Sequence, residues 1–129
     1  MKNLLKQYIL DTYGTESEHP FVSAPDTEIF RNPRNQKWFA VLLGQLPKRC
    51  LGLKDDGVAD VLNLKCDPIM TFTLIDRQRI FRAYHMNKDH WISVLLDSAI
   101  TMDELTFLVD LSYRLVDQRA KPKTKKTEK

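Results

Sequence analysis

Apolar residues recur along the chain at two different spacings, and each spacing predicts one kind of secondary structure. Spacings of three and four residues near both ends of the chain predict amphipathic helices, one over 1–13 and one beginning after 101. Shorter runs of apolar and branched residues between them predict strands. The five predicted strands cover 27–31, 37–46, 58–65, 80–84 and 91–96.

Polar residues, glycine and proline set the ends of these elements. Gly14 is expected to stop the first helix, because glycine readily adopts the left-handed conformation that follows a helix. Asp67 and Pro68 suit the first positions of a second helix, which we expect to end near residue 78. Thr101 and Glu104 have the spacing of a capping box at the start of the last helix.

The predicted order is helix, three strands, helix, two strands, helix, which places the chain in the α+β class. The connections between strands are short, and short connections favour antiparallel neighbours with helices packed on one side. A continuous apolar run from Trp38 to Leu43 predicts that the second strand is buried on both faces or has a twisted central position. We therefore expect a two-layer fold with a largely antiparallel five-stranded sheet. The connection over 48–57 is expected to be irregular, with a short strand at 50–53.

The connection between the last two strands is unusually rich in functional groups. Residues 85–91 contain two histidines, an asparagine, a lysine, an aspartate and a tryptophan. Asn87 and Asp89 favour a turn, because their short polar side chains hydrogen-bond to the nearby backbone. We expect a strand, a polar turn and a strand here, with Trp91 anchoring the turn to the core.

Length and composition indicate one domain without a membrane segment. The 129 residues suffice for a single domain, which we place at 1–118. No apolar run approaches the roughly 20 residues that a membrane-spanning helix needs. The N-terminal stretch lacks the small-residue cleavage site of a signal peptide. We therefore expect a cytoplasmic protein in which Cys50 and Cys66 are free thiols.

The net charge of +3 is unevenly distributed along the chain. Residues 119–129 carry six cations and one carboxylate, so this tail contributes +5 and the 1–118 body is slightly acidic. The tail contains a proline and no large apolar residue, which predicts disorder. Backbone contacts with nucleic acid need clustered lysine and arginine, so only a local basic face of the body could provide them.

Candidate metal and enzyme sites lack required parts. The spacing of His85 and His90 matches no zinc pattern, and no third ligand lies nearby except Asp89 or Cys66. Cys66 at a helix N-terminus would have a lowered pKa, but no oxyanion-binding device or orienting group accompanies it. We therefore expect no enzymatic activity, no metal and no cofactor.

Three blocks of sequence resemble the MmcQ/YjbR family of small bacterial proteins. The first block runs from His85 through His90 and Trp91 to Asp97, the second is Leu64–Pro68, and the third is Leu108–Tyr113. The resemblance implies a compact fold similar to secretion chaperones or to frataxin, and it assigns Trp91, Asp97 and Tyr113 to the family motif. It also implies a proposed DNA-binding role through a double wing, with no settled enzymatic activity.

Two basic turns are the candidate wings. They would meet the phosphates of a duplex and make few base contacts. The candidate contacts are Arg31, Arg34, Lys37, Arg79, Arg82, His85, Asn87, Lys88 and His90. In a strand, Arg77 and Arg79 would point the same way and Arg82 the opposite way.

Alternatives remain at both the motif and the whole protein. The motif residues could instead hold the last hairpin together, with Asn87 capping the turn and His90 bonding to a backbone carbonyl. The protein as a whole could be a protein-interaction module or a homodimer without a role in nucleic-acid binding. The basic tail could attract phosphate without sequence preference.

Overall fold

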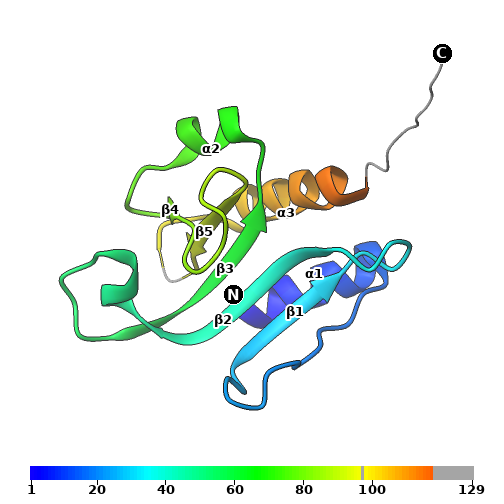
Figure 1. Ribbon diagram of the computed structural model, residues 1–129, viewed down its shortest axis with the longest axis horizontal. Helices are drawn as coiled ribbons and strands as arrows, with labels where there is room; N and C mark the ends of the chain where they lie inside the picture. The colour runs from blue at the N-terminus through cyan, green and yellow to red at the C-terminus, as the bar shows by residue number, and fades with distance from the viewer. Residues whose placement is uncertain (97, 118–129) are drawn as a thin grey trace.

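The structure is a computed structural model that describes residues 1–96 and 98–117, and it shows one sheet with helices behind it (Figure 1). The strands are β1 (Thr27–Arg31), β2 (Trp38–Pro47), β3 (Val58–Lys65), β4 (Ile80–Arg82) and β5 (Trp91–Leu95). The helices are α1 (Lys2–Tyr13), α2 (Pro68–Leu74) and α3 (Met102–Asp117), and a short 3-10 helix, η1, covers Lys48–Leu51. The predicted α+β class and element order are confirmed. The predicted basic tail lies outside the described residues.

Every strand pair in the sheet is antiparallel, in the spatial order β1-β2-β3-β5-β4. The apolar run of β2 lies between two neighbouring strands, and its residues from Phe39 to Leu42 are buried. Alternate residues of a strand face opposite sides, so four buried residues in a row require cover on both faces of the sheet. The sequence prediction for this strand is therefore confirmed.

Helices α1 and α3 cover one face of the sheet and form the main core with it. Leu5 and Ile9 of α1, together with Leu105 and Val109 of α3, pack with sheet residues such as Phe39. Helix α1 ends at Gly14 in the left-handed conformation, as the sequence predicts.

The capping box at the start of α3 forms as predicted. The Thr101 hydroxyl accepts from the backbone N–H of Glu104 at 3.1 Å, and a Glu104 carboxylate oxygen accepts from the Thr101 N–H at 3.0 Å. These two bonds pair backbone donors that a helix N-terminus would otherwise leave without a partner.

Loops rather than long helices cover the opposite face, which we call the loop face. There Trp91 packs with Ile29 and Val41, and Met86 from the β4–β5 connection covers this cluster. A second cluster around Phe81 is covered by residues from the connection between β2 and β3. The β4–β5 connection therefore folds back over the sheet instead of projecting from it, as Figure 1 also shows.

Three predicted boundaries are wrong. Residues 48–51 form η1 instead of a strand at 50–53, because Gly52 turns left-handed and donates its N–H to Arg49. Helix α2 ends at Leu74 rather than near 78, because Ile75 is extended and the chain then turns around Asp76. Strand β4 ends at Arg82, two residues earlier than predicted.

Candidate nucleic-acid interface

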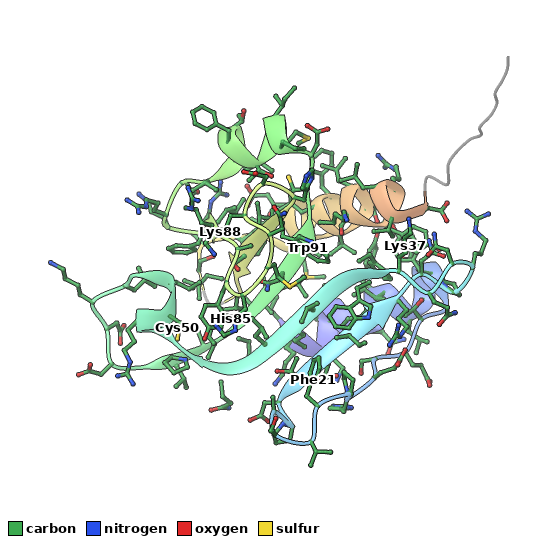
Figure 2. The ribbon with its side chains drawn as sticks, viewed as in Figure 1. Phe21, Lys37, Cys50, His85, Lys88 and Trp91 are labelled. Atoms are coloured by element: carbon green, nitrogen blue, oxygen red, sulfur yellow. The ribbon has the colours of Figure 1, made fainter. Side chains whose placement is uncertain are left out.

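The registers of the sheet bring the two basic loops to one end of the molecule. Arg31 at the end of β1 pairs with Trp38 at the start of β2, and Lys65 at the end of β3 pairs with Trp91 at the start of β5. Arg82, the last residue of β4, pairs with Ile92 of β5. The β1–β2 turn and the β4–β5 connection therefore leave the sheet at the same end. Figure 2 shows Lys37 on one side of Trp91 and Lys88 on the other.

Two of the three cations in the β1–β2 turn are already paired with carboxylates. The Arg31 guanidinium lies 2.9 Å from a Glu18 carboxylate oxygen, and Arg34 forms an ion pair with Asp117 at the end of α3. Lys37 is exposed, and in the part of the chain that the structure describes it has no carboxylate within ion-pair distance. Of this predicted wing, only Lys37 retains a charge that no carboxylate offsets.

Arg79 lies at the other end of β4 and is also paired. It contacts Asp76 at 2.9 Å and Glu104 at 2.5 Å. Residues 77–79 form a bend before the strand, so the predicted strand-like alternation of Arg77 and Arg79 is wrong. The Asp76 carboxylate accepts three backbone N–H groups of this bend, from residues 78, 79 and 80. Burial raises the pKa of Asp76, but these N–H donors and Arg79 outweigh it and leave the pKa well below its ordinary value.

Most motif side chains in the β4–β5 connection hold the connection together. The Asn87 side-chain oxygen accepts the N–H of Asp89 at 2.8 Å, and the Asn87 carbonyl accepts the N–H of His90 at 3.2 Å. Lys88 folds back and donates its ammonium to the Ala83 carbonyl at 2.7 Å. The bond from His90 to a backbone carbonyl is made by its main-chain N–H, which any residue at this position would provide. His85 adopts a positive φ of 59° and stacks on Tyr84.

A buried polar network beneath this connection was not predicted from the sequence. The Ser93 hydroxyl donates to the side-chain oxygen of Asn63 at 2.5 Å and accepts the N–H of Tyr84 at 2.9 Å. The Asn63 amide in turn donates to the Tyr84 carbonyl at 3.0 Å. Asn63 and Ser93 are neighbours in the β3–β5 register, so the network joins two central strands to the start of the connection. The signal in the sequence is Asn63 between two leucines of β3, together with Ser93 among the apolar residues of β5.

The comparisons with known proteins cover most of the chain. The family model described as YjbR matches residues 10–115. The uncharacterized protein YyaQ of Bacillus subtilis (strain 168) is 34% identical over 109 residues, which span 84% of this chain and 92% of YyaQ. The chain belongs to the YjbR family.

Solved structures agree with this assignment and with the fold. A crystal structure of a Pseudomonas syringae protein superposes with a TM-score of 0.85 at 35% identity, covering 89% of this YjbR chain and 97% of that chain. A solution NMR structure from Pseudomonas syringae gives a TM-score of 0.80 at 35% identity over 89% and 91% of the two chains. The crystal structure of Deinococcus radiodurans protein DR2400 gives 0.71 at 24% identity over 95% and 83%, a likeness of fold alone.

The three residues assigned to the YjbR motif differ in what the structure shows of them. Trp91 is buried on the loop face, with only 8% of its surface exposed, and the Lys65 ammonium lies 5.6 Å from its ring. Its ring is therefore part of the core and does not form a surface for stacking bases. Tyr113 stacks on Tyr13 at 3.8 Å between ring centres. Asp97 lies outside the described residues.

The chemistry considered for Cys66 is not favoured in this YjbR chain. Burial raises the pKa of the Cys66 thiol, and the neighbouring Asp67 carboxylate adds to that rise. The lowered pKa considered for a cysteine at a helix N-terminus is therefore wrong here. Within residues 1–96 and 98–117, no group of three histidine, cysteine or acidic side chains could hold a metal ion. None of the helices in these ranges is long and apolar enough to cross a membrane.

Cations without carboxylate partners lie along β4 and at the loop end, by which we mean the end of the sheet that the β1–β2 turn and the β4–β5 connection leave. Lys37 and Lys65 stand at the ends of central strands, while Arg82 and Lys88 flank the start of the β4–β5 connection. None of the four has an ion pair with another described residue. Asp89 in the same connection reduces the local positive charge. The structure thus retains a small cationic surface here although the body as a whole is slightly acidic.

Proposed function

We propose that this YjbR protein is a non-enzymatic protein that binds duplex DNA weakly, mainly through phosphate contacts. The observation that carries the proposal is the placement of both basic loops at one end of the sheet, where Lys37, Lys65, Arg82 and Lys88 lack carboxylate partners. Phosphate neutralisation by lysine and arginine releases counterions and gives affinity without sequence preference. The imidazoles of His85 and His90 are additional donors at this surface.

The ion pairs in the structure decide how much each of the two loops contributes to phosphate binding. Arg31, Arg34 and Arg79 are held by carboxylates, so a phosphate would have to compete with those pairs. Lys37 is the main contact from the β1–β2 turn, and the β4–β5 connection makes the larger share of contacts. The side-chain oxygen of Asn87 accepts a hydrogen bond within the turn, and this orients its NH2 group, which can donate to a phosphate.

The first experiment separates the body from the basic tail. Fluorescence anisotropy with a labelled duplex, at low and at moderate salt, is measured for the full chain and for a variant that ends at Gln118. We expect both proteins to bind at low salt and both to weaken as salt rises. Absence of binding by either protein at low salt refutes the proposal. Binding by the full chain alone would assign the whole effect to the tail.

Single charge removals then locate the surface on the body. Lys37→Gln and Lys88→Gln each remove a cation from the loop end. Lys54→Gln is the matched control, because Lys54 is exposed in the connection before β3, at the opposite end of the sheet. We expect the first two variants to bind more weakly and the control to bind like the parent. Equal effects of all three would mean that only net charge matters.

A second candidate function, self-association as a protein-interaction module, is favoured by exposed apolar residues around α2. Ile69 and Phe72 of α2 are 79% and 90% exposed, and Phe107 of α3 is 55% exposed. Phe107 also lines a cavity of about 410 Å³ between α3 and the end of α2. We propose that a second copy of the chain occupies this cavity. Phe72 and the cavity belong to one helical layer, so in a two-fold pair the Phe72 side chain of each copy can enter the cavity of the other.

Sedimentation tests this candidate directly. We expect a concentration-dependent dimer that Phe72→Glu disrupts. Val22→Glu is the control, because Val22 is 99% exposed and belongs to the connection before β1. A strict monomer at all concentrations removes this candidate and leaves the DNA proposal untouched.

A further inference from the structure

A small cationic cavity lies on the loop face between η1 and the β4–β5 connection. Arg77, Arg82, Tyr84 and Lys88 line it, together with Cys50 of η1, and its volume is about 170 Å³. No carboxylate lines it. Figure 2 shows Cys50 beside His85, with Lys88 of the same connection above them. Three cations around one small cavity, without an acidic residue among them, form a surface suited to an anion.

The donors around the cavity retain capacity for a ligand. Arg77 forms no ion pair within the described residues, and its neighbour Asp76 is already paired with Arg79. Lys88 gives one N–H to the Ala83 carbonyl, and an ammonium has three N–H groups, so two are left. The neighbouring Cys50 thiol raises the pKa of the Tyr84 phenol, and burial adds to that rise, so this hydroxyl can donate at neutral pH.

The size of the cavity limits what can enter it. Pockets for drug-sized ligands begin at roughly 300 Å³, so a cavity of about 170 Å³ fits one compact group. A phosphate inside a strand has a chain attached on both sides and must lie along an open trough. A terminal phosphate has a chain on one side only, and it carries more negative charge than an internal phosphate, which increases its attraction to arginine and lysine.

A second cavity continues from the cationic one. It has a volume of about 230 Å³ and shares Leu51, Arg77 and Phe81 with its neighbour, while Gly52 and Leu53 complete it. Leu51 and Leu53 contribute apolar side chains to it, but polar groups make up most of its lining. A sugar attached to a phosphate in the first cavity would therefore meet mainly polar groups within reach.

We propose that this pair of cavities binds the terminal phosphate and terminal nucleoside of a nucleic-acid strand. The inference rests on the proposed function and refines it, because it adds a contact at a strand end to the contacts along the duplex that Lys37, Lys65, Arg82 and Lys88 make. Arg77 and Lys88 hold the phosphate, and the mainly polar second cavity beside Leu51 and Gly52 receives the sugar of the nucleoside. No covalent step is involved.

The test compares oligonucleotides that differ only in a 5′-phosphate. Two otherwise identical duplexes, both labelled at a 3′ end, are titrated with the full chain at low salt. We expect the phosphorylated duplex to bind about tenfold more tightly, the size of effect expected for one added charge-assisted hydrogen bond. Arg77→Gln should remove this difference. Arg114→Gln is the matched control, because Arg114 lies on α3 behind the sheet and lines a different cavity.

A second measurement does not depend on any variant. Amide chemical shifts of the parent protein are followed during titration with a nucleoside 5′-monophosphate and, separately, with the nucleoside alone. We expect the monophosphate to shift the amides of Arg77, Tyr84 and Lys88, while those of α3 stay in place. Equal binding of both duplexes, with no shifts at these amides, overturns the inference and leaves the DNA proposal standing. Failure of every duplex to bind defeats the DNA proposal itself.

Discussion

At the scale of single residues, the motif side chains of the β4–β5 connection mainly fix the backbone conformation of that connection. Asn87 caps its own turn, Lys88 bonds to Ala83, and Trp91 is buried. Beneath them, Asn63 and Ser93 bond to both backbone polar groups of Tyr84. A conformation with a positive φ at His85 persists because these neighbours fix the residues on either side of it.

Ser93→Ala should therefore destabilise the protein although it removes a single oxygen atom. The change leaves the Tyr84 N–H and the side-chain oxygen of Asn63 without their hydrogen-bond partner in a buried site. Loss of such a partner costs about 1–3 kcal/mol of folding free energy. Urea unfolding monitored by tryptophan fluorescence measures the difference. Ser23→Ala, at an exposed position, is the control and should change the free energy of unfolding little. Equal stability of the two variants would show that the network contributes nothing.

The sequence predicts only part of the candidate site, because ion pairs between residues far apart in the chain form only in the folded protein. The turn propensity of Asn87 is local, so the sequence predicts it correctly. The partners of Arg31 and Arg34 are Glu18 and Asp117, which come together only in the folded chain. A count of cations along the sequence therefore overstated the charge of the β1–β2 turn. The involvement of Arg77 in a cavity with Lys88 depends on how η1 folds back over β4.

At the scale of elements, strands were predicted well and the short helices poorly. The apolar run of β2 and the alternation of β3 reflect burial, which periodicity detects directly. The end of α2 depends on Asp76, whose carboxylate collects three N–H groups and turns the chain toward β4. The same residue holds Arg79, which also bonds to Glu104 at the start of α3. One carboxylate thus links the turn before β4 to the N-terminus of α3.

Asp76→Asn should lower stability in a way that depends on pH. The pKa of Asp76 in the folded protein lies below its unfolded value of about 3.9, so its contribution is present above that pH and is lost as pH falls toward the folded pKa. We expect the variant to be less stable by about 1 kcal/mol at pH 7, because neutral hydrogen bonds replace charge-assisted ones. The gap between the two proteins should narrow below about pH 4.

Urea titrations at pH 7, 5 and 3 measure this gap. Asp56→Asn serves as the control, because Asp56 is exposed in the connection before β3 and has no hydrogen bond to another described residue. Its substitution should leave the unfolding midpoint almost unchanged at each pH. A gap for Asp76→Asn that stays constant from pH 7 to pH 3 would contradict the assigned role of the carboxylate.

At the scale of the whole molecule, function depends on how charge is distributed over the fold. The long helices lie on one face of the sheet, while the loop face and the loop end carry Lys37, Lys65, Arg77 and Lys88. The chain carries a net charge of +3, but residues 119–129 supply more than that total, so the body is slightly acidic. Binding of DNA by the body thus depends on local placement of charge and must be sensitive to salt.

The slope of log affinity against log salt concentration measures how many phosphates the protein neutralises. Each phosphate contact contributes about 0.9 to the slope for duplex DNA. For the protein that ends at Gln118, we expect the double substitution Lys37→Gln and Lys88→Gln to reduce the slope by about 1.8, because two contacts are lost. Removal of the tail from the full chain should reduce it independently, so the two effects should add. A slope that changes only when the tail is removed would mean that the folded body makes no phosphate contacts. The placement of both loops at one end of the sheet would then serve the fold and not DNA binding.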